Sequence, residues 1–309
     1  MKQTKGAGMS EHSKTAVIGL GSMGYGMAQS CVAAGLPTYG YDTRPEQAAR
    51  FRSEGGQDGA LHDIAPKLAA AAIVVLNAAQ TEEVLFGQNA LVPLMPPGSV
   101  VLGCATVAPE FARDMQTRCQ AHRVHYLDAP ISGGSIKAAQ GKLSVMASGT
   151  AEAFATARPM LDAVAETVFE LGAAAGAGSA MKAVNQMLAG VHIAAMAEAL
   201  TFGMTQGVTP DAFLKVISKC AGTSWMLENR APHIVAGDYA AHSQVNIWPK
   251  DLGIVSEIAD AAGFQAPITQ AALQQYLKAV DMGLGPEDDA AVAKVYARAS
   301  GLRLPGEAE

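Results

Sequence analysis

The sequence is poor in cysteine, in aromatic residues and in charge, and each shortage excludes classes of protein. Of its 309 residues, 4 are cysteine, 6% are aromatic and 16% are charged. The cysteines show no Cys-x-x-Cys spacing, which argues against a disulfide framework or a zinc ribbon and is typical of a reduced, cytoplasmic protein. No run of about 18 uncharged apolar residues occurs, so we expect no membrane span.

Basic residues are also scarce, with 22 Lys and Arg against 28 Asp and Glu and a net charge of −6. They are scattered rather than clustered, so we expect no nucleic-acid partner. His122 and His125 lie close together, but no Cys, Asp or Glu cluster completes a ligand set, and we expect no metal site. What is abundant is apolar residues, at 50% of a chain long enough for two domains.

The first half of the chain alternates short apolar runs with helical stretches. We expect residues 1–13 to be a disordered extension and residues 14–175 to form a Rossmann domain, a doubly wound and mostly parallel α/β fold. The predicted strands are 15–18, 38–41, 73–76, 100–103, 125–128, 143–148 and 167–171. The predicted helices between them are 23–34, 45–54, 63–69, 81–86 and 109–121.

The pattern over residues 176–309 is helical throughout and predicts an all-α domain. A glycine- and alanine-rich segment at 172–178, a candidate hinge, leads into a long interdomain helix at 179–206. Because this helix is apolar on more than one face, we expect it to pack against a second subunit in a homodimer or homotetramer. The further predicted helices are 210–221, 224–234, 248–262, 267–282 and 288–298.

A glycine-rich turn lies between the first predicted strand and helix, and it reads Gly19-Leu20-Gly21-Ser22-Met23-Gly24. The pattern Gly-x-Gly-x-x-Gly in this context is the fingerprint of dinucleotide binding. Gly19 permits the tight turn, Gly21 lets the backbone approach a pyrophosphate, and Gly24 lets helix and strand pack closely. Free N–H groups at the helix start attract phosphate. The turn therefore predicts an NAD site, with the pyrophosphate over residues 20–23.

Asp42 ends the second predicted strand, about 20 residues beyond the turn. A carboxylate in this place accepts hydrogen bonds from the ribose hydroxyls of NAD and repels the 2′-phosphate of NADP. Arg44 can pair with that phosphate, so NADP remains possible. The alternative is that Asp42 only starts a turn before Pro45.

Two further candidates for cofactor contact follow predicted strands at the sheet edge where ligands bind: Asn77 with Ala78, and Thr106. Either could instead be an ordinary helix cap.

In the same way, Ser132-Gly133-Gly134 follows the strand 125–128. Its hydroxyl and unhindered N–H groups suit a small carboxylate, although a simple turn would look the same.

Lys182 lies about one turn into the long helix, with Asn185 at i+3 and Gln186 at i+4, so the three can share a face. Apolar neighbours partly desolvate the lysine, which favours the neutral amine and predicts a proton carrier. A snorkelling surface lysine is the alternative. Lys250 opens a later helix and is either a cofactor contact or a solvated residue.

Five motifs occur in a familiar order: 19–24, 104–109, 128–134, 176–185 and Lys250-Asp251-Leu252. Over roughly residues 14–302 the chain resembles the β-hydroxyacid dehydrogenase family. The resemblance implies an NAD- or NADP-dependent oxidoreductase acting on a small hydroxyacid, with Lys182 as general acid/base. It also implies contacts to the substrate from Asn185, Ser132, Gly133 and Gly134, and contacts to the cofactor from Thr106 and Lys250.

Within the family, residues 74–87, 250–255 and 285–289 are most similar to the L-threonate branch. This implies oxidation of L-threonate to 2-oxo-tetronate (2-dehydro-L-erythronate). Reduction of tartronate semialdehyde and oxidation of 3-hydroxyisobutyrate remain as alternatives. A non-catalytic dinucleotide-binding protein is a third, but such a protein would be expected to lack Lys182. Gln186 departs from the family pattern, in which a second asparagine is common at this position.

Overall fold

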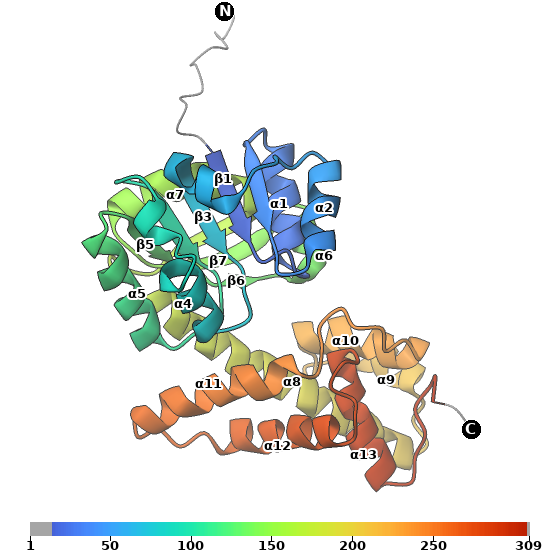
Figure 1. Ribbon diagram of the computed structural model, residues 1–309. Coiled ribbons are helices and arrows are strands. Elements are labelled where there is room, and N and C mark those ends of the chain that lie inside the picture. The colour runs from blue at the N-terminus through green and yellow to red at the C-terminus, as the bar shows by residue number, and fades with distance from the viewer. Residues whose placement is uncertain (1–13, 308–309) are drawn as a thin grey trace, which may run out of the picture. The chain divides into compact units, whose positions relative to one another are not determined.

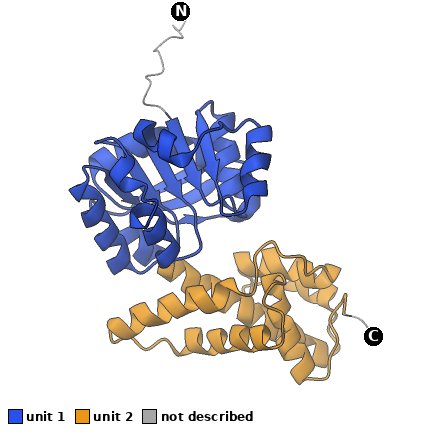
Figure 2. Ribbon diagram, viewed as in Figure 1, with its two compact units in different colours: residues 1–182 blue, residues 183–309 orange. Residues whose placement is uncertain are grey.

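The structure is a computed structural model that describes residues 14–307, so the predicted extension 1–13 lies outside the described residues. The chain divides within its longest helix into two compact units, Met1–Lys182 and Ala183–Glu309, which Figure 2 shows in different colours. We call them unit 1 and unit 2. The start of the long helix, up to and including Lys182, therefore belongs to unit 1.

Unit 1 is built on a five-stranded parallel sheet in the order β2-β1-β3-β4-β5 (Figure 1). The strands are β1 (Lys14–Ile18), β2 (Thr38–Tyr41), β3 (Leu68–Ile73), β4 (Val100–Gly103) and β5 (His125–Asp128). The order reverses between β1 and β3, and ligands bind at the carboxyl ends of the strands at such a point. This topology confirms the predicted Rossmann fold class.

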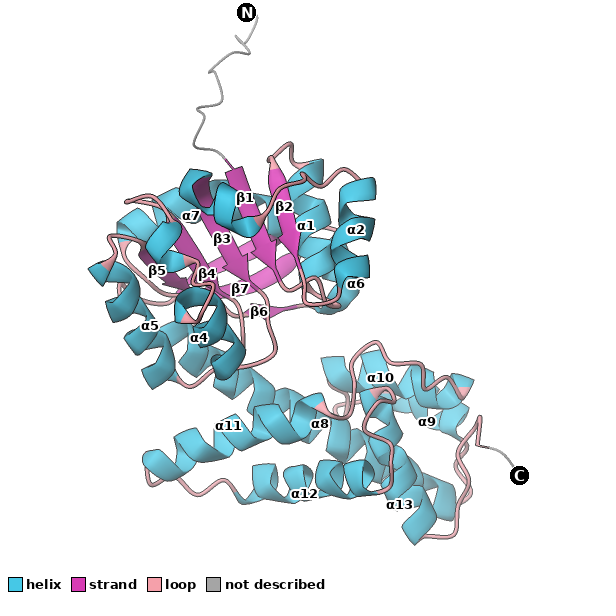
Figure 3. Ribbon diagram, viewed as in Figure 1, coloured by secondary structure: helices cyan, strands magenta, loops and turns pink. Residues whose placement is uncertain are grey.

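Helices follow the strands and cover the sheet (Figure 3). They are α1 (Gly24–Ala33), α2 (Pro45–Ser53), α3 (Leu61–Ile64), α4 (Ala78–Phe86) and α5 (Pro109–Ala121), with 3-10 turns at Ala65–Lys67 and Val92–Leu94. Pro45 and Pro109 begin α2 and α5, where the missing N–H costs no hydrogen bond. Most of the predicted helices of this region are confirmed within a few residues.

The predicted limits of the helix and strand in residues 63–76 were wrong. Residues 63–67 are helical, in α3 and the 3-10 turn that follows it, but β3 occupies Leu68–Ile73, where the end of the helix and a loop were expected, rather than 73–76. The strand contains Ala70, Ala71 and Ala72, whose intrinsic preference is for helix. They are buried between β1 and β4, with Ala72 opposite Val17 and Leu102, so the pairing of the sheet overrides local propensity.

A second, three-stranded sheet holds the last two predicted strands. It has the order β6-β7-β8, from β6 (Ile131–Ser132), β7 (Leu143–Ala147) and β8 (Ala165–Glu170). A bridge between Asp128 and Ser148 joins it to the end of β5. Two helices of this region were not predicted, α6 (Gly134–Ala139) and α7 (Ala151–Val164). The start of α7 carries a recognisable cap, since Thr150 accepts a hydrogen bond from the Ala153 N–H.

Unit 2 is helical, as predicted, and its core forms around α8. The helices are α8 (Ala177–Thr205), α9 (Pro210–Ile217), α10 (Trp225–Ala236), α11 (Ile247–Ala261), α12 (Pro267–Asp281) and α13 (Ala293–Ala299), with a 3-10 turn at Asp289–Val292. Trp248 and Tyr276 stack with ring centroids 5.6 Å apart. A Cβ on Gly190 would lie 2.9 Å from atoms of Trp248 and Leu252, so this glycine lets α8 and α11 approach closely.

By length and composition alone, α8 could cross a membrane, and it is the one helix of the described residues 14–307 that could. Its residues Ile193, Met196 and Leu200 are buried in the core of unit 2. A core helix of a globular domain meets the same criterion. Other residues of α8 are exposed within the single chain, Val184, Leu188 and Phe202 among them.

Candidate active site

The glycine-rich turn joins β1 to α1, and two close backbone approaches shape it. Gly19 has a φ of +96°, and a Cβ there would lie 2.2 Å from the carbonyl oxygen of Val74. A Cβ on Gly24 would lie 1.8 Å from the carbonyl oxygen of Gly19. Neither position has room for a side chain, so both glycines are required by the fold itself.

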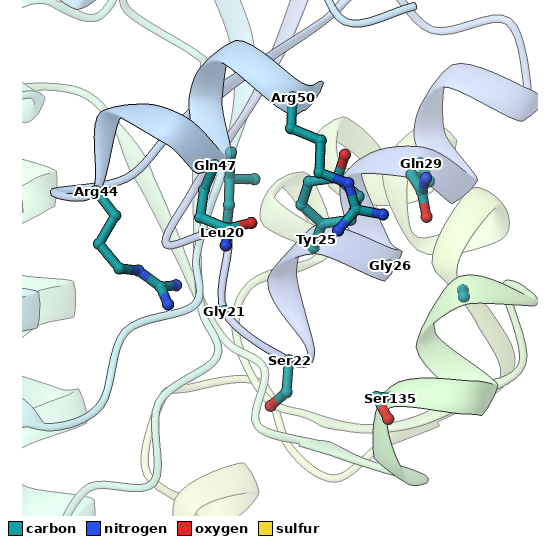
Figure 4. A pocket seen from close by; sticks show the side chains of 11 residues that line it. Leu20, Gly21, Ser22, Tyr25, Gly26, Gln29, Arg44, Gln47, Arg50 and Ser135 are labelled. Carbon is teal, nitrogen blue, oxygen red and sulfur yellow. The ribbon is translucent and has the colours of Figure 1, made fainter. Parts of the chain in front are cut away.

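Gly21 is different, because no heavy atom lies within 4 Å of the place where its Cβ would be. Together with Ser22 it lines a cavity of about 360 Å³ at the start of α1, into which Arg44 and Arg50 also reach (Figure 4). The first turn of α1 carries no acidic residue. N–H groups at a helix start and guanidinium groups suit phosphates, so the residues present fit a dinucleotide.

Asp42 is fixed beside this turn. Its Oδ2 accepts a hydrogen bond of 2.8 Å from the Leu20 N–H, and its Oδ1 accepts bonds of 2.9 and 3.0 Å from the N–H and Nε of Arg44. Burial would raise the pKa of Asp42, but the bonds from Arg44 and Leu20 lower it below its usual value. An ionised carboxylate and a guanidinium therefore lie side by side, which suits ribose hydroxyls and a 2′-phosphate respectively, so both NAD and NADP fit.

The two candidates for cofactor contact that follow β3 and β4 differ in whether they cap a helix. Asn77 is the cap of α4 and accepts a hydrogen bond of 2.9 Å from the Gln80 N–H, with Ala78 as the first helical residue. Thr106 does not cap α5, because the cap position is Ala108. Cofactor contact by these residues stays a prediction.

The turn of Ser132, Gly133 and Gly134 follows Asp128 at the end of the sheet. Ser132 ends β6, and Gly133 and Gly134 have φ values of +136° and +77°. Backbone conformations of this kind turn successive N–H groups toward one point and can hold an anion. A Cβ on Gly134 would meet nothing within 4 Å, so the turn is open on that side. Its binding of a carboxylate stays a prediction.

Lys182 is only 8% exposed, although Met181 and Val184 beside it are 44% and 52% exposed. Its Nζ donates a hydrogen bond of 2.8 Å to the carbonyl oxygen of Ile131. That residue directly precedes Ser132, so the amine lies beside the turn predicted to hold the substrate carboxylate. This burial contradicts the alternative of a snorkelling surface lysine.

In unit 2, a chain of hydrogen bonds connects two of the predicted residues. The Asn185 amide donates to Gln186 Oε1 at 2.8 Å, and Gln186 Nε2 donates to Asp251 Oδ2. The other oxygen of Asp251 is paired with the ammonium of Lys250. Asn185 is therefore oriented by Gln186, and Lys250 is an ion-paired residue rather than a solvated one.

The sequence did not indicate that Asp251 accepts a hydrogen bond from Gln186, or that the side chains of Asp128 and Ser148 accept hydrogen bonds from backbone N–H groups at the start of α8. Asp251 directly follows Lys250 in a motif that was recognised, and Asp128 opens another, so proximity to those motifs was the available signal. Ser148 carried no such signal, because only the bridge to β5 brings it to the site.

Within residues 14–307, no group of three or more His, Cys, Asp or Glu side chains is placed to hold a metal ion.

Two family models match the chain. Residues 14–172 match the NAD-binding domain of 6-phosphogluconate dehydrogenase, and residues 176–296 match the model described as the NAD-binding part of NADP-dependent 3-hydroxyisobutyrate dehydrogenase. The two matches cover units 1 and 2 almost completely. They agree with the parallel sheet and the helical unit of the structure.

Individual relatives are similar over nearly the whole chain. The L-threonate dehydrogenase of Cupriavidus necator is 47% identical over 95% of this chain and 98% of its own length. That of Escherichia coli K12 is 43% identical over 94% of this chain and 96% of its own length. Among solved structures, 3-hydroxyisobutyrate dehydrogenase from Salmonella typhimurium has a TM-score of 0.86 and 43% identity over 91% of this chain and 99% of that one. The chain therefore belongs to the β-hydroxyacid dehydrogenase family of NAD(P)-binding oxidoreductases.

Proposed function

We propose that this enzyme oxidises L-threonate at its 2-hydroxyl group, giving 2-oxo-tetronate, with NAD as its preferred coenzyme. The observation that carries the proposal is the identity of 42–47%, over 94–95% of the chain, with five relatives named L-threonate dehydrogenase. The ionised Asp42 beside the glycine-rich turn supports NAD, because a carboxylate favours ribose hydroxyls over a phosphate.

A bound coenzyme would supply the hydride acceptor, and the residues of the chain position the acid and move its proton. In this proposal the Ser132–Gly134 turn holds the carboxylate. Lys182 Nζ accepts the proton of the 2-hydroxyl as the C–H bond breaks, so the products are the 2-oxo acid, the reduced coenzyme and one proton. Asn185, one turn further along α8, fixes the hydroxyl group, and this positioning supplies much of the rate.

A panel of initial rates tests the substrate. We expect kcat/KM for L-threonate with NAD to exceed that for D-threonate, 3-hydroxyisobutyrate and tartronate semialdehyde by at least about tenfold, a difference of 1.4 kcal/mol in transition-state binding. Each acid is measured with NAD(H) and NADP(H). A higher kcat/KM with any other acid would overturn the substrate, and a higher value with NADP would overturn the coenzyme.

Oxidation of 3-hydroxyisobutyrate is the second candidate. It is favoured by the Salmonella typhimurium structure, which carries that name at 43% identity and a TM-score of 0.86. Tartronate semialdehyde reduction has no named relative of comparable similarity among those above. The same panel separates all three reactions.

We also propose that the protein is a cytoplasmic homo-oligomer in which α8 packs against a second copy. The support is that Phe202 is 66% exposed, and Val184 and Leu188 about half exposed, within a single chain. Light scattering is expected to give a mass of at least twice 31.8 kDa, and Phe202→Glu is expected to shift it toward the monomer. A wild-type monomer at micromolar concentration would contradict the proposal.

A further inference from the structure

Asp128 is a buried carboxylate to which neither the family resemblance nor the proposed reaction assigns a part. It ends β5 and has no exposed surface. Its side chain reaches the start of α8, where Oδ2 accepts hydrogen bonds from the N–H groups of Gly176 (2.8 Å) and Ser179 (2.9 Å). The Ser179 hydroxyl donates to Oδ1 at 2.7 Å. A carboxylate distant in sequence thus satisfies N–H groups at the start of a helix, as a local cap does elsewhere.

Ser148 completes this arrangement from a third segment. Its hydroxyl donates to Asp128 Oδ2 at 3.2 Å and accepts from the Gly178 N–H at 3.0 Å. The backbones of Asp128 and Ser148 also exchange hydrogen bonds of 3.0 and 2.8 Å. We call Asp128, Ser148, Ser179 and the two glycine N–H groups the Asp128 cap. It joins the ends of β5 and β7 to the first turn of α8.

Two glycines of the predicted hinge, Gly176 and Gly178, allow the start of α8 to pack this closely against the ends of β5 and β7. A Cβ on Gly178 would lie 2.4 Å from the Met146 carbonyl oxygen and 2.8 Å from that of Asp128, and Gly176 has a φ of +111°. In the structure these glycines are tightly packed, not loosely linked. A side chain on Gly178 would push the start of α8 away from Asp128, and one on Gly176 would be strained by the positive φ and would meet Arg113 of α5.

Lys182 lies one turn after Ser179, and its Nζ is bonded to Ile131, three residues after Asp128. Residues 128–131 therefore contain both the carboxylate of the Asp128 cap and the carbonyl oxygen that accepts a hydrogen bond from the Lys182 amine. This segment leads directly into Ser132. We propose that Asp128 is a positioning residue, which fixes the first turn of α8 so that the Lys182 amine lies beside the turn that receives the substrate carboxylate. The inference rests on the proposed role of Lys182.

Burial raises the pKa of Asp128 above its usual value, and the hydrogen bonds from Ser179, Gly176 and Ser148 only partly offset this rise. The four hydrogen bonds to its side chain all come from donors, which is the arrangement that a carboxylate accepts. The neighbouring Cys104 thiol has a pKa raised by burial to about 12, so it is neutral near pH 7. The Arg113 guanidinium lies against Gly176 from α5, and its positive charge is compatible with a carboxylate here.

A double-mutant cycle tests whether Asp128 acts through Lys182. Asp128→Ala is expected to lower kcat for L-threonate by about ten- to a hundredfold, the cost of a misplacement of about 1 Å. In the Lys182→Ala background the same change is expected to alter kcat by less than about twofold, because the amine it positions is already gone. Asp128→Asn keeps the shape and an acceptor for the N–H groups, and it is expected to restore most of kcat.

Controls separate this role from general stability. Thr150→Ala removes the cap of α7 in the same unit and is expected to leave kcat unchanged. Amide hydrogen exchange without coenzyme is expected to increase at residues 176–182 in Asp128→Ala and not in Thr150→Ala. If Asp128→Ala does not fold, Ser179→Ala, which removes the bond to Oδ1, is expected to lower kcat several-fold in the wild-type background and not in Lys182→Ala.

Equal losses from Asp128→Ala in both backgrounds would overturn the inference while leaving the proposed function intact. Unchanged hydrogen exchange at residues 176–182 would overturn it as well. An active Lys182→Ala enzyme, in contrast, would overturn the proposed role of the lysine, whatever Asp128 does.

Discussion

Lys182→Ala is expected to lower kcat by roughly two to four orders of magnitude, the range for loss of a general acid–base group. The physical reason is that Lys182 is only 8% exposed and its amine lies 2.8 Å from the Ile131 carbonyl oxygen, next to the Ser132 turn. Water cannot easily replace a proton acceptor at such a site. Coenzyme affinity, measured by the fluorescence of bound NADH, is expected to stay unchanged because the glycine-rich turn is intact.

Two further variants sharpen this experiment. Lys182→Arg keeps the positive charge and the hydrogen-bond donor, but a guanidinium does not lose its proton in proteins, so its kcat is expected to be as low as that of Lys182→Ala. Lys215→Ala on α9 removes an exposed lysine of unit 2 and is expected to be fully active. If Lys182→Arg were active, positive charge rather than proton transfer would be the function of the lysine.

The second large effect is expected in the glycine-rich turn, where the same substitution of glycine by alanine is compared at two positions. Gly24→Ala would place a methyl group 1.8 Å from the Gly19 carbonyl oxygen, so the turn must distort. We expect the free energy of unfolding to fall by about 3 kcal/mol, the upper end of the usual range for overpacking. Binding of NAD is expected to be lost with it.

Gly21→Ala is the matched variant. Its methyl group would meet no atom within 4 Å, so stability is expected to change by less than about 0.5 kcal/mol. The methyl group would, however, occupy the surface that a pyrophosphate approaches, and the Kd for NAD is expected to rise at least about tenfold, which is 1.4 kcal/mol. Calorimetric titration and thermal unfolding measure the two effects separately. Wild-type affinity in Gly21→Ala would place the dinucleotide elsewhere.

Most of the fold followed from local patterns. The glycine-rich turn lies between β1 and α1 as predicted, and α8 begins and ends within two residues of its predicted limits. The prediction was wrong at β3, because an alanine-rich strand has no local feature that distinguishes it from a helix. The pairing partners that decide the matter are distant in sequence.

Residues of the candidate site could be predicted from the sequence where their type and their spacing within one helix indicate the chemistry. Lys182 and Asn185 lie on the same helix, and their spacing alone put them on one face. The hydrogen bonds that orient them were not predictable, since Gln186 reaches Asp251 across 65 residues and Asp128 reaches Ser179 across 51. Such partners meet only when separate elements pack together.

The sequence by itself determined most of the succession of strands and helices, the phosphate-binding turn and the lysine on the long helix. Each of these depends on periodicity, on backbone freedom at glycine, or on spacing within one element, and these are local properties of a chain. Only the tertiary structure decided that Asp128 would cap α8 and that Asp251 would hold Gln186. A buried polar group must find its hydrogen-bond partner wherever the fold brings one within reach, and local sequence does not contain that information.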